Sequence, residues 1–246
     1  MARFFLPKEN IQDKHGTMVG EEFDHLCKVL RLGPGDPIII FDGTGWEHEA
    51  VIRSLGAKHA DLEIVRSYET QRESSLKATL ALGLTKGEKM DWVVEKTTEL
   101  GVHTIVPFVS IYTVPKLADQ RLAKRIMRWR KIAVSAAKQC GRARIPEILP
   151  LTDFRALVRE SRPDVLKLLL WEAESGRTLS HVRAMQPHVE SVLMVVGAEG
   201  GFSVEEANLA MEHGFHSVGL GRRTLRAETA ALAAVSLAQF VWGDLG

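Results

Sequence analysis

The chain of 246 residues contains 45% hydrophobic and 26% charged residues, ordinary proportions for a soluble protein of one large or two modest domains. Its two cysteines, Cys27 and Cys140, lie far apart and outside C-x-x-C spacing, which indicates neither a disulfide framework nor a zinc site. We therefore expect a cytoplasmic protein. No apolar run is long enough for a signal peptide or a membrane span, and the histidines lack ligand spacing, so we expect no membrane association and no metal.

The net charge of +1 hides an uneven distribution. Residues 1–70 contain 8 basic and 12 acidic residues, whereas residues 116–144 contain 10 basic residues and 1 acidic residue. Such a local excess favours contact with a polyanion, although a solvated helix face would show the same pattern.

The first 70 residues predict a small β-rich domain. Its expected elements, in chain order, are a strand at 3–6, a helix at 21–32 and strands at 37–42, 46–54 and 61–68. Gly33-Pro34-Gly35-Asp36 ends the helix, and Asp42-Gly43-Thr44-Gly45 is a hairpin signal. One helix with several short strands favours a compact barrel. The polar residues 70–75 then predict a linker.

Residues 75–246 predict an α/β domain. An apolar strand at 76–84, a helix with an apolar face that ends at Gly101 and a strand at 103–109 form one crossover unit of a parallel sheet. Another strand is expected at 165–171, before the loop 172–176. Glu172 in that loop would either orient a ligand amine or face water.

A long basic helix is expected between these strands. Its apolar stripe consists of Leu122, Ile126, Trp129, Ala133, Ala136 and Cys140, which makes Cys140 a core residue and not a nucleophile. Basic residues cover the rest of the surface, and one acidic residue cannot neutralise them by pairing within the helix. We therefore favour contact with a polyanion over a solvated face.

Residues 191–242 carry the strongest functional signal. The strand 191–196 ends at Gly197-Ala198-Glu199-Gly200-Gly201, and Ser203 with Glu206 forms the capping box of a helix that closes near Gly214. The strand 216–220 runs into Gly221-Arg222-Arg223-Thr224-Leu225-Arg226, before an Ala-rich helix from Glu228 to Trp242. Because ligands bind beyond the carboxyl ends of parallel strands, these loops predict one pocket. The missing G-x-G-x-x-G and G-K-[ST] motifs argue against a dehydrogenase or a phosphate loop.

This order of motifs, GAEGGFS then LGRRTLRAETAA, closely resembles the RsmE family of SPOUT methyltransferases. HLCKVLRL, KMDWVVEKTTELGVHTIVPF and Gln139-Cys140-Gly141-Arg142 with Pro146 extend the resemblance over almost the whole chain. It implies a SPOUT-type parallel sheet with a deep trefoil knot at about 165–230, within a methyltransferase domain at 75–246. It also implies a PUA- or OB-like RNA-binding barrel at 1–70, for which a packing or dimer-positioning role is the alternative.

The resemblance implies a homodimer that uses S-adenosylmethionine to methylate N3 of a uridine in 16S ribosomal RNA, near the decoding centre of the small subunit. The implied cofactor contacts are Leu170, Trp171, Glu172, Val196, Gly197, Glu199, Gly200, Gly201, Leu220, Gly221, Leu225, Arg226 and Thr229. From charge and position, the expected RNA contacts are Arg3, Arg31, Arg121, Lys124, Arg125, Arg128 and Lys131, and the resemblance implies Arg142 as a further one.

Arg226 and Glu199 are the candidate catalytic residues. An arginine beside the uracil carbonyl oxygens would stabilise the anion formed when the ring nitrogen loses its proton. The alternative for Arg226 is an ion pair with Glu228 at the helix start. Glu199 would orient the cofactor or order the glycine turn, and is less convincing as a base.

Three features of the sequence depart from the family pattern. Ala198 replaces a usual proline, which should leave the loop less pre-organised, and Thr224 replaces a common isoleucine. Tyr112 and Thr113 replace a frequent Arg-Ser, so one expected RNA contact is missing and the target is less secure. Two rivals therefore remain: a non-catalytic RNA-binding assembly factor and a methyltransferase that modifies the ribose hydroxyl.

Overall fold

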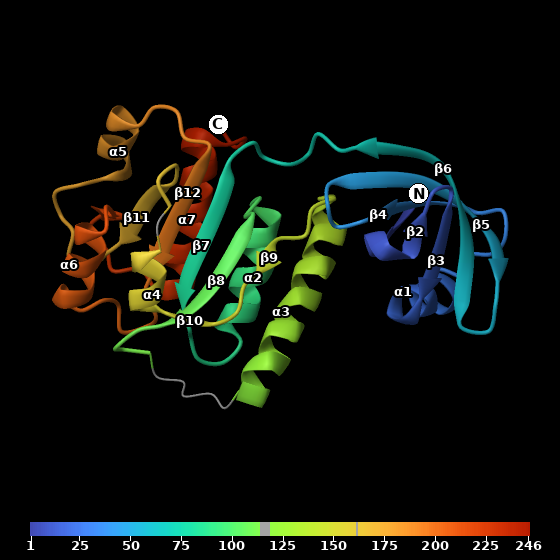
Figure 1. Cartoon of the computed structure of the whole chain (residues 1–246), viewed down its shortest axis with the longest axis horizontal. Coiled ribbons are helices and arrows are strands. Elements are labelled where there is room, and N and C mark those ends of the chain that lie inside the picture. The colour runs from blue at the N-terminus through green and yellow to red at the C-terminus, as the bar shows by residue number, and fades with distance from the viewer. Residues whose placement is uncertain (114–118, 161) are drawn as a thin grey trace. The chain divides into compact units, whose positions relative to one another are not determined.

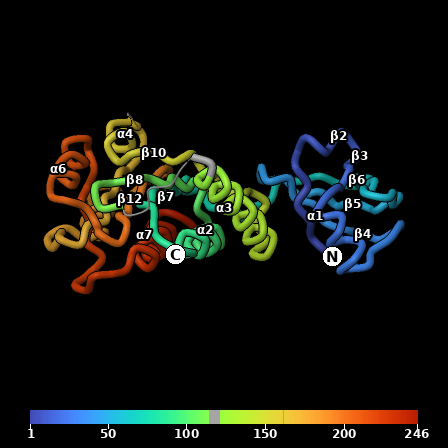
Figure 2. Tube along the Cα trace, turned by 90° about the horizontal axis from the view of Figure 1, so that it is seen from below, coloured from blue at the N-terminus to red at the C-terminus, as the bar shows by residue number. Residues whose placement is uncertain are grey.

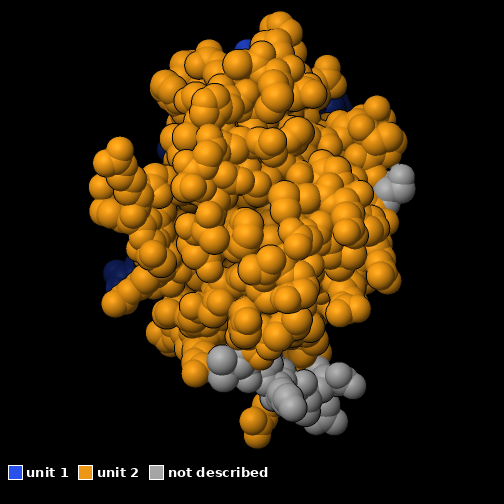
Figure 3. Space-filling view, turned by 90° about the vertical axis from the view of Figure 1, so that its left-hand side faces the viewer, with its two compact units in different colours: residues 1–73, 134–145 blue, residues 74–133, 146–246 orange. Residues whose placement is uncertain are grey.

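The computed structural model describes residues 1–113, 119–160 and 162–246. The chain divides into two compact units, coloured separately in Figure 3. Unit 1 comprises residues 1–73 and 134–145, and unit 2 comprises residues 74–133 and 146–246. The chain thus returns to unit 1 for a short segment, which the sequence pattern did not indicate.

Unit 1 is built on a six-stranded sheet with the order β1-β4-β5-β6-β3-β2. Its strands are β1 (Ala2–Phe5), β2 (Ile11–Gln12), β3 (His15–Val19), β4 (Pro37–Phe41), β5 (Trp46–Leu55) and β6 (His59–Glu69). Only β1 and β4 pair in parallel; the other pairs are antiparallel. Alternate residues of the strands, among them Phe4, Ile38 and Ile52, are buried in one apolar core.

The helix expected at 21–32 is shorter than predicted. A 3-10 turn at Lys8–Asn10 precedes it, α1 covers Gly20–Asp24, and one π-helical turn continues to Val29. Arg31 then has φ +55°, a left-handed conformation in which a helix cannot continue. Leu26 of the π-helical turn is buried in the core of unit 1.

Unit 2 contains a wholly parallel sheet with the order β10-β8-β7-β12-β11-β13, and β9 pairs beside β8. The strands are β7 (Lys77–Gly83), β8 (Thr104–Val109), β9 (Glu147–Ile148), β10 (Thr152–Asp153), β11 (Leu166–Leu170), β12 (Ser191–Val196) and β13 (His216–Val218). Their apolar runs suit strands covered on both faces. The predicted parallel α/β sheet is therefore confirmed.

Helices cover both faces of this sheet (Figures 1 and 2). They are α2 (Lys89–Glu99), α3 (Asp119–Cys140), α4 (Phe154–Arg159), α5 (Leu179–Met185), α6 (Val204–Glu212) and α7 (Ala227–Trp242). Figure 2 shows α4 and α6 on one face and α2 and α7 on the other. Phe108, Phe154 and Phe202 pack together under α4 and α6. No helix in the described ranges is long and apolar enough to cross a membrane.

The predicted capping box of α6 is present. Glu206 N–H donates to Ser203 Oγ at 3.1 Å, and Ser203 N–H donates to Glu206 Oε2 at 3.1 Å. These bonds satisfy two N–H groups that the first turn of a helix leaves without partners. They also fix the exit of the glycine loop 197–201.

Candidate active site

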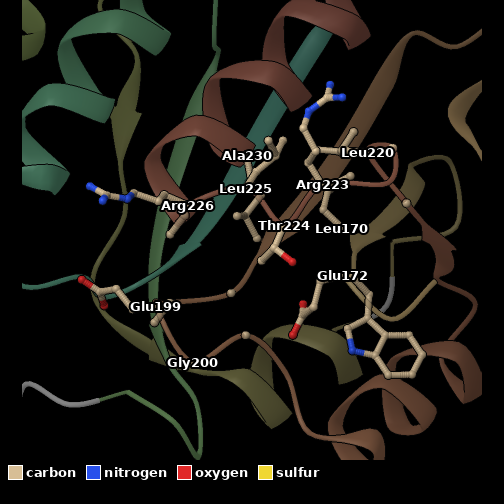
Figure 4. Close-up of a pocket in the computed structure, with 18 of the residues that line it drawn as sticks. Leu170, Glu172, Glu199, Gly200, Leu220, Arg223, Thr224, Leu225, Arg226 and Ala230 are labelled. Atoms are coloured by element: carbon tan, nitrogen blue, oxygen red, sulfur yellow. The ribbon is translucent and has the colours of Figure 1, made fainter. Parts of the chain in front are cut away.

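Three loops meet at one edge of the sheet of unit 2. In the parallel register Leu170 at the end of β11 is level with Val196 of β12 and Val218 of β13, so the loops that follow these strands leave the sheet together. They enclose a cavity of about 470 Å³ (Figure 4). Its wall is formed by Lys89 and by residues 170–172, 196–201, 218–227 and 230. Its size is that of a small-molecule pocket.

The cavity brings together the residues expected to contact the cofactor. Every one of them lies in its wall except Thr229, which is exposed on α7. Lys89, at the start of α2, lines the cavity although the sequence pattern did not single it out. The one sequence feature that could have indicated Lys89 as a cavity residue is its position just after a strand and the turn Lys86-Gly87.

The loop 197–201 is held by contacts at several positions. Gly201 N–H donates to Ala198 O at 3.0 Å, which closes the turn although Ala198 stands where a proline is usual. Gly201 has φ +65°, and a Cβ there would lie 2.2 Å from Glu172 Oε1. Glycine is therefore required at this position for both its backbone conformation and the space it leaves.

Glu199 fastens the same loop to α2. Its Oε1 accepts from Lys89 Nζ at 3.1 Å and from Lys86 N–H at 3.2 Å. Burial opposes the charged form, but these bonds and the residue's own backbone N–H hold the pKa of Glu199 below its ordinary value. A carboxylate stabilised in this way is a weak base, so the contacts support an ordering role and not proton removal.

Lys89 links two parts of the cavity wall. Besides Glu199, its Nζ lies 3.6 Å from Glu228 Oε2 in the first turn of α7. The hydrogen bond that Lys89 donates to Glu199 is the main cause that raises the pKa of Lys89, against a smaller effect of burial. One ammonium group thus connects the loop after β12 with the helix after β13.

The Arg226 side chain is exposed and makes no hydrogen bond or ion pair with any described residue. The anticipated ion pair with Glu228 is absent, because Glu228 faces Lys89. Figure 4 shows Arg226 and Glu199 on one side of the cavity, and Thr224 and Glu172 facing each other on the other. The Arg226 guanidinium is therefore available to an anionic or carbonyl-bearing ligand.

Glu174, which the sequence did not indicate, orders the third loop. It accepts from Ser217 Oγ, from Gly176 N–H at 2.7 Å and from Arg177 N–H at 3.0 Å. These bonds, the one from Ser217 foremost, lower the pKa of Glu174. Glu172 is exposed and lines the cavity.

The basic residues of α3 differ in their surroundings. Arg121 and Lys124 are exposed, whereas Arg128 pairs with Asp91 of α2 at 2.7 Å. Arg125 lies over the Trp129 ring and donates to Thr85 O at 3.4 Å. Lys131 is exposed and also interacts with its surroundings. Acidic residues of α2 thus neutralise part of the charge that pairing within α3 cannot.

Two of the arginines expected to contact RNA are structural in unit 1. Arg3 pairs with Glu47 at 2.9 Å and donates to Arg142 O at 2.7 Å. Arg142 is 6% exposed and pairs with Glu73 at 2.8 Å. These internal pairs leave neither guanidinium free for phosphate, so the structure does not support either residue as an RNA contact. Arg31, by contrast, is exposed, so its side chain is accessible to a phosphate.

No cluster of metal-ligating side chains occurs within the described ranges of the chain. The lining of the cavity suits an organic ligand. Its apolar wall at Leu170, Val196, Leu220 and Leu225 suits a flat ring, and the glycine loops present backbone polar groups.

Family models match both parts of the chain. An RNA methyltransferase domain matches residues 72–239, and an RNA methyltransferase PUA domain matches residues 20–65. The protein named ribosomal RNA small subunit methyltransferase E of Bacillus subtilis is 33% identical over 96% of this chain and 95% of its own length.

Solved structures of methyltransferases are similar to this chain over nearly its whole length. Ribosomal RNA small subunit methyltransferase E from Neisseria gonorrhoeae, bound to S-adenosyl methionine, has a TM-score of 0.89 and 35% identity and covers 100% of both chains. A Legionella pneumophila methyltransferase in complex with the same cofactor has a TM-score of 0.89 and 36% identity, covering 99% of this chain and 98% of its own.

Proposed function

This chain belongs to the ribosomal RNA small subunit methyltransferase E family, and we propose that it transfers a methyl group from S-adenosylmethionine to N3 of a uridine in 16S ribosomal RNA. One observation carries the assignment to this site: the exposed Arg226 guanidinium, without an internal partner among the described residues, in the wall of a cavity of about 470 Å³.

The residues of the cavity fit S-adenosylmethionine. Leu170, Val196 and Leu220 would hold its adenine ring, and the backbone groups of the glycine loops would bind its polar edges. Glu172 would attract its ammonium group. When bound, this cofactor supplies a methyl group already activated by a sulfonium, so the protein must place a nucleophile and exclude water.

Arg226 would act on the uracil ring. Its positive charge beside the carbonyl oxygens lowers the pKa of the N3 proton, which then passes to solvent or to a group of the RNA complex. The N3 lone pair forms the new bond to carbon while the sulfonium sulfur keeps the electrons of the bond that breaks. Glu199 holds the loop through Lys89 and takes no proton.

The exposed basic residues of α3, Arg121 and Lys124, would contact the RNA backbone, together with Arg31 in the PUA domain. Arg125, Arg128 and Lys131 would add to the field of this helix, although Arg128 is shared with Asp91. An assembled small subunit in the cytoplasm is the proposed substrate, with the uridine near the decoding centre.

Finer features of the fold belong to the same proposal. Gly219 N–H donates to Arg177 O at 3.0 Å, and a Cβ at Gly219 would lie 2.3 Å from Glu174 O. This close passage supports a chain threaded through the loop after β11, as in a trefoil knot at about 165–230. The sheet of unit 1 would curl into a barrel over residues 1–70, and residues 75–246 would form the catalytic domain.

A homodimer is proposed through α7. Leu237 and Phe240 of this helix and Trp92 of the adjacent α2 are exposed apolar side chains. Exposed apolar surface of this kind is typical of an interface. Each subunit would then bring its partner's α7 close to its own start of α2.

Mass analysis of nucleosides tests the proposal. Unmodified small subunits are incubated with the protein and cofactor carrying a labelled methyl group, and the RNA is digested to nucleosides. We expect the label in 3-methyluridine alone. Label on a ribose oxygen would favour the sugar-modifying alternative, and cofactor binding without any label would favour a non-catalytic assembly factor.

A further inference from the structure

Tyr112 is an exposed aromatic residue that packs against Gly200, a residue of the cavity wall. It follows β8 and is 47% exposed. A Cβ built on Gly200, which lines the cavity, would lie 2.6 Å from Tyr112 Cβ and 3.2 Å from its Cγ. Only glycine at position 200 permits this approach, so the first atoms of the tyrosine side chain pack directly against the loop 197–201.

The turn that carries Tyr112 is fixed on both sides. Ser110 N–H donates to Thr113 Oγ1 at 2.8 Å, and Thr113 N–H donates to Ser110 O at 3.1 Å. Ile111 N–H donates at 3.0 Å to Glu206 Oε1, whose carboxylate is buried and also caps α6. The backbone is thus held in place while 47% of the Tyr112 surface stays exposed.

The Tyr112 side chain makes no polar or aromatic contact with the described part of the protein. The Tyr112 hydroxyl makes no hydrogen bond to any residue in the described ranges, and the ring forms no aromatic pair there. Large aromatic side chains normally bury most of their surface, so a side chain left 47% exposed on an ordered turn, against a residue that lines the cavity, is placed for a ligand to cover it.

We propose that Tyr112 is a positioning residue whose ring stacks on the nucleobase presented to the cavity. Enzymes that modify RNA bases bring the base out of its stack and hold it against aromatic side chains. Any of the four bases can stack on an aromatic ring in this way, because each has a flat face. The inference rests on the proposed function, because the same site must receive a base. The ring, and not the hydroxyl, carries the role.

Steady-state kinetics with unmodified small subunits tests this role in Tyr112→Ala, Tyr112→Phe and the matched control Ile111→Ala. Ile111 is the exposed neighbour in the same turn, with 62% exposure, and the atoms nearest a Cβ at Gly200 belong to Tyr112 and not to Ile111. We expect Tyr112→Ala to raise KM for the subunit about tenfold, in the range of one lost base–aromatic stack. Tyr112→Phe and Ile111→Ala should stay within about twofold, and cofactor affinity by calorimetry should be unchanged in all three.

Three results would overturn the inference. An unchanged KM in Tyr112→Ala would show that the nucleobase does not stack on the Tyr112 ring. A Tyr112→Phe variant as impaired as Tyr112→Ala assigns the role to the hydroxyl, and loss of cofactor affinity in Tyr112→Ala shows that the side chain only supports the loop. Failure of the proposed function looks different, because the unaltered protein would then yield no 3-methyluridine.

A second variant approaches the contact from the other side. In Gly200→Ala the new methyl group meets Tyr112 Cβ, so the tyrosine must shift. We expect a higher KM for the subunit. Because only glycine at position 112 removes the Cβ that the new methyl group meets, the double variant Gly200→Ala with Tyr112→Gly should be no worse than Tyr112→Gly alone. Fully additive losses would contradict a shared cause.

Discussion

The two glycine loops of the cavity differ in how they are held. Loop 197–201 is tied down by Glu199 through Lys89, by the packing of Gly200 against Tyr112 and by the turn that Gly201 closes. In the loop 221–226, Arg222, Arg223 and Arg226 are exposed and have no ion-pair partner among the described residues. The anchored loop gives the cavity a fixed wall, and the other leaves positive charge available to RNA.

The same contrast separates the other basic residues. Arg3 and Arg142 are locked in ion pairs of unit 1, while Arg121 and Lys124 of α3 are exposed. A buried pair is costly to break because it leaves one charge without a partner. Exposed groups are free to exchange counterions for phosphates. The number of basic residues in the sequence is therefore larger than the number whose side chains can contact RNA phosphates.

The largest effect should come from Arg226→Ala. Loss of one group that stabilises a developing anion lowers kcat by about 100- to 1000-fold. Cofactor affinity should change by less than about tenfold, which corresponds to about 1.4 kcal/mol. Single-turnover methylation and calorimetry give the two quantities. A variant with full activity would remove Arg226 from the chemistry.

Gly201→Ala tests the anchored loop. Its Cβ would collide with the Glu172 carboxylate, so we expect cofactor affinity to fall at least about tenfold as the wall shifts. Gly214→Ala is the matched control, because Gly214 also has positive φ, +82°, but a Cβ there meets nothing within 4 Å. Both should lose stability in thermal unfolding, and only Gly201→Ala should lose cofactor. Equal cofactor affinities would contradict the assigned wall.

A moderate effect on RNA binding is expected from Arg121→Ala combined with Lys124→Ala. If both side chains contact phosphates, the slope of log K against log salt should become shallower by about 1 to 2. Filter binding across a salt series measures this slope. The reverse control is Arg142→Ala, which should lower the free energy of unfolding by about 3–5 kcal/mol because Glu73 is left without its partner. An unchanged slope in the double variant would place the RNA elsewhere.

The smallest effect is expected from Lys89→Ala. Exposed ion pairs contribute little, so cofactor affinity should weaken about two- to fivefold. Because the pKa of Glu199 is lowered, its contribution persists above the ordinary carboxyl pKa and is lost only in acid; the raised pKa of Lys89 preserves its contribution until strong base. The ratio of the cofactor affinities of the unaltered protein and Lys89→Ala should therefore stay constant from about pH 6 to about pH 9. A step within that range would mean that another group titrates in the wall.

Local patterns predicted much of unit 2. The apolar runs gave β7, β8, β11 and β12, the glycine-rich ends gave the loops of the cavity, and Ser203 with Glu206 gave the start of α6. Each of these signals lies within a few neighbouring residues, where backbone preference and burial act together. Short elements such as β9, β10, α4 and α5 lack such a pattern and were not predicted.

Long-range contacts were beyond the sequence pattern. Arg3 meets Glu47 and the backbone of Arg142, and Lys89 meets Glu199 and Glu228, all far apart in the chain. Pairs of this kind arise only when the fold brings distant segments together. The return of residues 134–145 to unit 1 has the same origin, because the apolar stripe of a helix does not say which core it enters.

A crystal structure of the protein with S-adenosylmethionine tests the central claim most directly. The account predicts the cofactor within the cavity formed by residues 170–172, 196–201 and 218–227, with its methyl group open to the side where Arg226 lies. A cofactor bound in another cleft, with these three loops unoccupied, would contradict it.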